Sequence, residues 1–170
     1  MDLKKFVRDV PDFPKDGILF KDLTTLWKSP EALKEAGKKL LELVDNHQID
    51  VVIGIESRGF VFAPMMAVEL QAGFVPVRKK GKLPAQTLQA EYALEYGTDV
   101  LEIHTDAIKK GDRVLIHDDV LATGGTAAAV VELVQRMGGE VVQCNFIMEL
   151  GFLNGRGKLQ GVPVAALLDY

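Results

Sequence analysis

The sequence predicts an α/β fold in which a mainly parallel sheet is flanked by helices. The first observation is a set of short, apolar, β-branched runs, typical of strands buried on both faces. These runs lie at residues 49–55, 74–77, 113–117, 141–148 and 162–168. The second observation is that helical patterns separate several of the runs, as crossover helices separate parallel strands. At 170 residues, the chain is expected to be a single domain, 1–170, with a sizeable core.

Composition and charge narrow the class of protein. The chain has 48% hydrophobic and 26% charged residues, which is ordinary for a globular protein. A formal net charge of −4 argues against a nucleic-acid partner, which would favour a basic face. We see no signal peptide, and no apolar run approaches the ~18–20 residues that span a bilayer, so we expect a cytoplasmic protein with no membrane partner. The single cysteine, Cys144, is expected to be a buried, inert thiol.

The N-terminal part begins with a short amphipathic stretch, Leu3 to Val10, and continues with a proline-containing segment that cannot be a regular helix. A helix is predicted to start at Ser29 as its cap, with Pro30 in the first turn and Glu31 at the positive end of the dipole. Its apolar face is predicted to consist of Leu33, Ala36, Leu40, Leu41 and Val44.

Two loops and a polar stretch follow in the middle of the chain. The strand at 49–55 leads into the turn Glu56 to Gly59 and a helix at about 60–70. The short strand at 74–77 ends in a loop, 78–82, in which four of five residues are basic. Such a charge run is often only a solvated loop. Residues 83–107 are polar with scattered aromatics, and a long, weakly structured stretch in a compact domain is usually functional, so we predict a β-flap or lid there.

The most informative segment follows the strand at 113–117. Two carboxylates, Asp118 and Asp119, precede a Thr-Gly-Gly-Thr turn, and a helical pattern then runs to the stop signal Gly138-Gly139. A turn between a strand and a helix directs backbone N–H groups and the helix dipole at one point, which suits a phosphate. The predicted phosphate-binding residues are Ala122, Thr123, Gly124, Gly125 and Thr126.

The two aspartates indicate which chemical groups are bound beside the phosphate. They would repel the anion itself, so they suit hydroxyl groups or a metal ion bound beside them. A phosphate together with vicinal hydroxyls indicates a ribose 5-phosphate. Adjacent side chains on an extended segment diverge, so we expect one aspartate to face the sugar and the other to orient a loop amide or a magnesium-bound water.

Other interpretations of the glycine turns fail or are weaker. Gly54 and Gly59 have the glycine spacing of a P-loop, but Phe60 and Val61 follow where Lys and Ser or Thr are needed. No Gly-x-Gly-x-x-Gly follows a strand, so the dinucleotide fingerprint is also absent. A plain αβ turn that happens to contain Asp-Asp and Gly-Gly remains as the structural alternative, although ligand sites gather at strand carboxyl ends.

At this point the chain resembles a known family, the type I phosphoribosyltransferases, and within it the adenine-specific branch. The segment 114–126 is similar to the family's motif for 5-phosphoribosyl 1-pyrophosphate (PRPP). The resemblance covers nearly the whole chain, in the family's order. Its other segments are Pro11–Pro14, Gly17–Phe20, Glu56–Phe60, Arg78–Pro84 and Leu94–Gly97. It implies the family's α/β fold, with an N-terminal hood of about 1–28 and a lid of about 83–107.

The resemblance also implies roles for individual residues. The two basic loops would bind pyrophosphate through Ser57, Arg58, Arg78, Lys79 and Lys82, and a cis peptide bond is expected at Glu56-Ser57. In the hood, Phe20 would stack on adenine while backbone groups of Leu19 and Lys21 read its amino edge. Many relatives carry arginine at the Lys21 position. Glu95 would assist proton removal from the purine, as the lid's catalytic residue.

The implied cofactor is Mg²⁺, held mainly by substrate oxygens and water with no direct protein ligand, because this ion keeps several waters. His47, His104 and His117 show no metal-ligand spacing and are expected to be structural or surface residues. The implied activity is purine salvage: adenine and PRPP give AMP and pyrophosphate, in a homodimer. The alternatives are a transferase for a 6-oxopurine (hypoxanthine, guanine or xanthine) and a PRPP-sensing regulator of the same fold.

Overall fold

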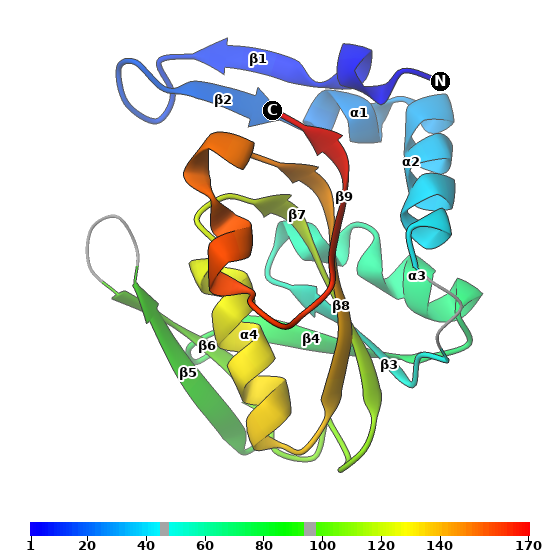
Figure 1. Ribbon diagram of the computed structural model, residues 1–170, viewed down its shortest axis with the longest axis vertical. Coiled ribbons are helices and arrows are strands. Elements are labelled where there is room, and N and C mark those ends of the chain that lie inside the picture. Colours follow the sequence, from blue (N-terminus) through cyan, green and yellow to red (C-terminus); the bar gives the residue numbers. More distant parts are fainter. Residues whose placement is uncertain (45–47, 94–97) are drawn as a thin grey trace. The chain divides into compact units, whose positions relative to one another are not determined.

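The computed structural model describes residues 1–44, 48–93 and 98–170 (Figure 1). The chain forms two compact units, Met1–Lys39 and Leu40–Tyr170. The helix α2 (Pro30–Glu42) begins in the first unit and ends in the second. Among the described residues, no helix combines the length and the apolar character needed to cross a membrane.

The first unit consists of a two-stranded antiparallel sheet and short helices. Strands β1 (Arg8–Pro11) and β2 (Leu19–Asp22) pair, and η1 (Leu3–Phe6) and α1 (Thr24–Lys28) flank them in the chain. The predicted cap of α2 is confirmed, because the Ala32 amide donates to Ser29 Oγ at 3.3 Å.

The second unit is built on a seven-stranded sheet with the order β5-β6-β4-β3-β7-β8-β9 (Figure 1). The five strands from β4 to β9 in this order are parallel, while β5 and β6 form an antiparallel hairpin attached to β4. The predicted α/β fold with a mainly parallel sheet is therefore confirmed. The strands are β3 (Val51–Ile55), β4 (Gly73–Lys79), β5 (Thr87–Ala93), β6 (Thr98–His104), β7 (Arg113–Leu121), β8 (Glu140–Glu149) and β9 (Val164–Asp169).

Two helices cover the sheet and create a switch point in its topology. α3 (Ala63–Glu69) connects β3 to β4 on one side, and α4 (Gly125–Arg136) connects β7 to β8 in the other direction. Because crossovers between parallel strands are right-handed, these helices lie on opposite faces. Ligands of such sheets bind outside the carboxyl ends of the strands where the order reverses, which is here between β3 and β7. The remaining short helices are η2 (Arg58–Phe60), η3 (Gly151–Leu153) and η4 (Gly155–Lys158).

The core of the second unit lies along the central strands. All five residues of β3 are buried, as its β-branched sequence predicts. Cys144 on β8 is fully buried, and burial raises the pKa of its thiol to about 12, which confirms an inert thiol. His117 is also fully buried: its Nδ1 lies 3.1 Å from Asn145 Oδ1, and burial lowers the pKa of the imidazole to about 4.

Several predicted boundaries differ from the structure. β7 continues through Asp118 and Asp119 to Leu121, so the two acids lie within the strand and not after its end. The expected helix at 60–70 is divided into η2 and the shorter α3, and β4 extends to Lys79. The polar stretch 83–107 contains the β5–β6 hairpin, which explains its partial alternation. Its role as a lid stays a prediction, as do the hood and the single-domain assignment.

Candidate active site

The turn after β3 and the strand β7 make backbone contact at the switch point. A Cβ added to Gly59 would lie 2.8 Å from the carbonyl oxygen of His117 and 3.2 Å from Asp118 Oδ1. Only glycine therefore allows the Glu56–Gly59 turn to approach β7 this closely. The Glu56-Ser57 peptide bond in this turn is cis, as the resemblance implied. The turn thus brings Ser57 and Arg58 to the strand that carries the two aspartates.

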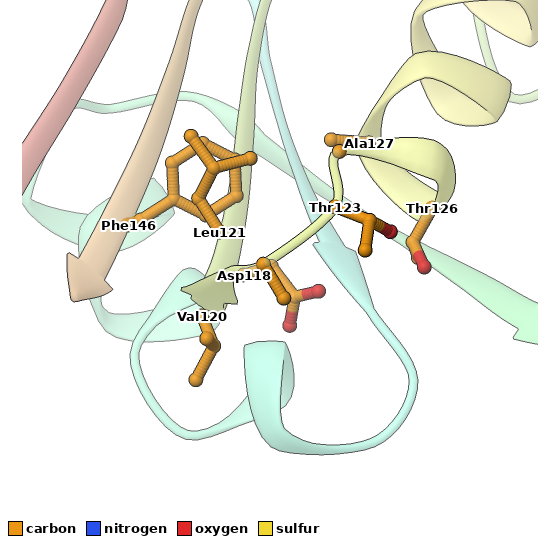
Figure 2. Close-up of a pocket in the computed structure, with 9 residues that line it drawn as sticks. Asp118, Val120, Leu121, Thr123, Thr126, Ala127 and Phe146 are labelled. Carbon is orange, nitrogen blue, oxygen red and sulfur yellow. The ribbon is translucent and has the colours of Figure 1, made fainter. Parts of the chain in front are cut away.

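An open pocket lies at the end of β7 and the start of α4. Figure 2 shows the Asp118 carboxylate and the hydroxyls of Thr123 and Thr126 around one part of it, with Leu121 and Phe146 in another part. The N-terminus of α4 supplies backbone N–H groups and the positive end of a helix dipole there. The lining residues are Asp118, Val120, Leu121, Ala122, Thr123, Gly124, Thr126, Ala127 and Phe146.

The loop of this pocket rests on a second glycine-containing segment. Gly124 adopts φ +79°, and a Cβ added to it would lie 2.3 Å from the carbonyl oxygen of Gly155. In return, a Cβ on Gly155 would lie 2.3 Å from the carbonyl oxygen of Ala122. Neither close approach leaves room for a side chain, so the loop before α4 and η4 hold each other in place.

An ion pair fixes this supporting segment to the sheet. Arg156 donates from Nε to both carboxylate oxygens of Glu149, at 2.9 and 2.8 Å, and from Nη1 to the carbonyl oxygen of Val164 at 2.8 Å. Glu149 is 7% exposed at the end of β8, and the bidentate contact compensates its burial. The pair therefore anchors η4 beside the loop before α4.

The two aspartates lie in different surroundings. Asp118 lines the pocket, and its Oδ1 accepts the amide of Asp119 at 2.8 Å. Asp119 is 2% exposed, and its Oδ2 lies 3.0 Å from Arg58 Nε. Burial, followed by the charge of Asp119, raises the pKa of Asp118 well above the usual value, and burial also raises the pKa of Asp119, against the opposing charge of Arg58.

The basic loop is tied to the turn after β3. The carboxylate of Glu56 accepts hydrogen bonds from Arg78 Nε at 3.2 Å, from Arg78 Nη2 at 3.1 Å and from the Lys79 amide at 2.9 Å. The Lys79 ammonium lies 3.1 Å from Asp99 Oδ2 on β6. Hydrogen bonding and charge from Asp99 raise the pKa of Lys79. Lys82 is exposed. Of the predicted pyrophosphate residues, Arg78 and Lys79 thus share one network with Glu56, whereas Arg58 is paired with Asp119.

The predicted adenine residues belong to the first unit. Leu19 is 53% exposed, the ring of Phe20 makes an edge contact with Phe13 at 5.2 Å between centroids, and Lys21 Nζ lies 2.7 Å from Asp9 Oδ1. Glu95 and His47 lie outside the described residues. His104 Nε2 accepts a hydrogen bond from the Ala85 amide at 3.3 Å.

Several residues of the site were missed by the sequence interpretation. Glu56 was recognised only as part of a motif, and Asp99, which pairs with Lys79, was not singled out within the polar stretch 83–107. Glu149 and Arg156 are seven residues apart, and no local pattern marks them as a pair. A polar residue in the otherwise apolar run 141–148, such as Asn145, was the one available signal for a buried polar contact.

Comparison with known proteins identifies related sequences over the full chain. Residues 22–154 match the family model described as "Phosphoribosyl transferase domain". The adenine phosphoribosyltransferase of Flavobacterium johnsoniae is 59% identical over 170 residues, covering 100% of both chains. That of Thermotoga maritima is 54% identical, covering 100% of this chain and 98% of its own.

Solved structures that are similar to this chain belong to the same family. The crystal structure of adenine phosphoribosyltransferase from Rhodothermus marinus is 58% identical with a TM-score of 0.93, covering 99% of this chain and 96% of that one. The Saccharomyces cerevisiae enzyme, complexed with an imino-altritol bisphosphate and adenine, is 45% identical with a TM-score of 0.91, covering 98% and 97%.

Proposed function

The chain belongs to the phosphoribosyltransferase family, and within it to the adenine phosphoribosyltransferases, and we infer that it converts adenine and PRPP to AMP and pyrophosphate. The single observation that supports the assignment to this chain's own residues is a pocket lined by the carboxylate of Asp118, by Thr123 and Thr126, and by residues at the start of α4. The carboxylate of such a pocket suits a sugar's hydroxyls, and its N–H and hydroxyl donors suit the 5-phosphate.

We propose that Ala122, Thr123, Gly124, Gly125 and Thr126 hold the 5-phosphate of PRPP. Backbone N–H groups at the start of α4 would donate to the phosphate, and the threonine hydroxyls would add donors. Asp118 is the aspartate that we assign to the ribose hydroxyls, because it lines the pocket. For Asp119 we propose the orientation of the Arg58 side chain, in place of the loop amide or magnesium-bound water expected from the sequence, because the two residues form an ion pair.

The leaving group needs positive charge and N–H donors as the bond from ribose C1 to pyrophosphate breaks. We propose that Ser57 and Arg58 in one loop, and the basic loop Arg78–Lys82 in the other, receive that charge. Within the described residues there is no cluster of three or more His, Cys, Asp or Glu side chains that could hold a metal. The carboxylate of Asp118 nevertheless offers a hard oxygen donor, and Mg²⁺ held mainly by substrate and water would fit beside it and neutralise pyrophosphate.

For the base, we propose that Phe20 stacks on adenine while backbone groups of Leu19 and Lys21 read its amino edge, and that Glu95 assists proton removal. A closing β5–β6 lid would exclude water, which otherwise hydrolyses an oxocarbenium-like intermediate. We also propose a homodimer, and a cytoplasmic location because the highly charged PRPP cannot cross a bilayer unaided.

The decisive experiment is an assay with PRPP, Mg²⁺ and each of adenine, hypoxanthine, guanine and xanthine in turn. Adenine is expected to yield nucleotide and pyrophosphate at least ~10⁴-fold more efficiently than the 6-oxopurines, because a wrong edge leaves buried polar groups unpaired. Efficient use of hypoxanthine would transfer the chain to the 6-oxopurine enzymes. PRPP binding without turnover of any base would favour a PRPP sensor.

A further inference from the structure

We propose that Asn145 is a positioning residue, which acts through His117 to set the distance between β7 and the Glu56–Gly59 turn. This inference deepens the proposed function and rests on it, because Asp118, the proposed ribose contact, directly follows His117 on β7. It gives a role to two fully buried polar side chains, whose desolvation an apolar pair at the same positions would avoid.

The side-chain amide of Asn145 binds the last turn of α2. Its Nδ2 donates to the carbonyl oxygen of Leu40 at 3.2 Å, and both residues belong to the second unit. The Val44 amide, four residues beyond Leu40, donates to the Leu41 carbonyl at 3.0 Å, so the usual helical donor to Leu40 is engaged elsewhere. Because a carbonyl only accepts hydrogen bonds, the nitrogen of the Asn145 amide must face Leu40, and its oxygen is left for another partner.

That partner is His117, and the contact determines which nitrogen of its ring carries the proton. Asn145 Oδ1 lies 3.1 Å from His117 Nδ1, and since an amide oxygen only accepts, Nδ1 is the donor. Burial lowers the pKa of the imidazole to about 4, so the ring is neutral at physiological pH and Nε2 carries no proton. Within the described part of the chain, the buried Nε2 has no hydrogen-bond partner. Asn145 therefore provides the polar contact that orients the ring.

His117 lies where β7 exchanges one neighbour for another. It is the last residue of β7 that pairs with β3, and its carbonyl oxygen then meets Gly59, where an added Cβ would lie 2.8 Å away. Its ring makes an edge contact with Phe62, the cap residue of α3, at 6.2 Å between centroids. One residue thus contacts both ends of the segment 59–62, which directly follows Arg58.

The position of His117 bears on two of the proposed substrate contacts. Successive side chains of a strand point to opposite faces, so Asp119 lies on the same face as His117, and Asp118 on the other. Asp119 Oδ2 lies 3.0 Å from Arg58 Nε, and Asp118 Oδ1 lies 3.2 Å from the position of a Cβ added to Gly59. A small shift of β7 against the turn therefore changes the surroundings of both aspartates.

A second amide on β8 provides a matched control. Gln143 is 6% exposed, and its Nε2 donates to the carbonyl oxygen of Leu43 at 3.0 Å, also at the end of α2. Within the described residues, the Gln143 side chain makes no polar contact with β7. Asn145→Leu and Gln143→Met therefore each remove one bond to the end of α2, but only Asn145→Leu releases His117.

The test measures PRPP affinity by calorimetry with Mg²⁺ present, well below the Tm of every variant. Asn145→Leu and His117→Phe are each expected to bind PRPP about 5- to 20-fold more weakly, and the double variant no more weakly than either one. Gln143→Met is expected to lower Tm while it binds PRPP within about twofold of the wild type. A purely structural role of Asn145 would lower Tm without this difference in affinity.

Nitrogen NMR of the histidine rings provides an independent measurement on the unmodified protein. Wild-type His117 is expected to carry its proton on Nδ1, and Asn145→Leu is expected to lose this fixed tautomer, whereas Gln143→Met is expected to retain it. This measurement does not depend on whether any variant folds. A proton on Nε2 of wild-type His117 would overturn the proposal.

Three results for PRPP affinity would also overturn it. Equal weakening in Asn145→Leu and Gln143→Met would locate the effect in α2, and additive losses in the double variant would show that Asn145 and His117 act separately. The third is wild-type affinity in Asn145→Leu or, if that variant does not fold, in His117→Phe. A wild-type protein that binds no PRPP would refute the proposed function itself, whereas normal wild-type binding with any of these three results refutes only the role of Asn145.

Discussion

Asp118 and Asp119 concentrate negative charge in a place where the protein alone does not fully neutralise it. Arg58 lies 3.0 Å from Asp119, but the pKa of Asp118 remains well above its usual value because of burial and of its neighbour's charge. Ionised Asp118 is therefore less favourable in the folded chain than in the unfolded one. The lower stability at this residue is what we expect of a group whose proposed role is to bind the ribose hydroxyls.

Replacing Asp118 by asparagine is expected to stabilise the ligand-free protein at neutral pH while weakening PRPP binding. A raised folded pKa lowers stability above that pKa, and the loss disappears as the pH falls toward the unfolded value of about 3.8. Asparagine keeps an Oδ1 acceptor for the Asp119 amide and carries no charge at any pH. Thermal melts from about pH 8 down to about pH 5 are the measurement, and the advantage of the variant must shrink on acidification. An advantage that does not change with pH would contradict the assignment.

At Gly124, alanine is expected to lower both stability and PRPP affinity. The residue has φ +79°, and the added Cβ would lie 2.3 Å from the Gly155 carbonyl oxygen, so the cost combines backbone strain of about 1–3 kcal/mol with a clash that moves the cradle. Gly111→Ala is a matched control, since that glycine has φ +89° with nothing within 4 Å of the added atom. The measurements are chemical denaturation and PRPP titration of both variants. Equal losses of PRPP affinity in the two variants would show that the clash with Gly155 is not the cause of the weaker binding.

Among the elements, β7 and the segment that follows β8 shape the pocket. β7 extends through the two aspartates because its parallel pairing with β8 continues as far as Leu121 and Glu149. The sequence pattern suggested an earlier end, since two adjacent charges interrupt the apolar run that signals a buried strand. Tertiary pairing overrode that local signal.

Glu149 and Arg156, the ion pair that anchors η4, are expected to be energetically coupled. Arg156→Gln leaves Glu149 largely buried without its partner and is expected to cost about 1–3 kcal/mol, a fall of about 3–10 °C in Tm, together with weaker ribose 5-phosphate binding. The double variant Glu149→Gln/Arg156→Gln is expected to recover part of the stability, because no uncompensated carboxylate remains. Differential scanning calorimetry tests this, and a double variant less stable than Arg156→Gln would refute the coupling.

The central parallel strands and the starts of α2 and α4 were predictable because their signals are local. Ser29 caps α2 within its own turn, and the glycines before and after α4 mark its ends in the sequence. The contacts of Glu56 with Arg78 and of Glu102 with Gly81 were not predictable, because they depend on which strands become neighbours. The hairpin β5–β6 joins the sheet beside β4, and no short segment of the sequence predicts this strand order.

For the whole molecule, base choice is expected to depend on the backbone of the first unit more than on its side chains. Lys21→Ala should therefore retain the preference for adenine over hypoxanthine, whereas Phe20→Ala should weaken binding of every purine through loss of a stacking surface. Steady-state kcat/KM values for both bases in the two variants are the measurement. Loss of the adenine preference in Lys21→Ala would show that the lysine side chain reads the base.

The pairing of β3 with β7 also determines when, during synthesis, the protein acquires its ability to bind. Val51 pairs with Val114, so the centre of the sheet closes only after the intervening hairpin and helix have been made. Contacts between residues this far apart require closure of a long loop before they contribute any stability. A chain still emerging from the ribosome exposes the Glu56 turn long before the cradle of α4 exists. We therefore expect the ability to bind PRPP to arise late in synthesis, once β7 and α4 have been made.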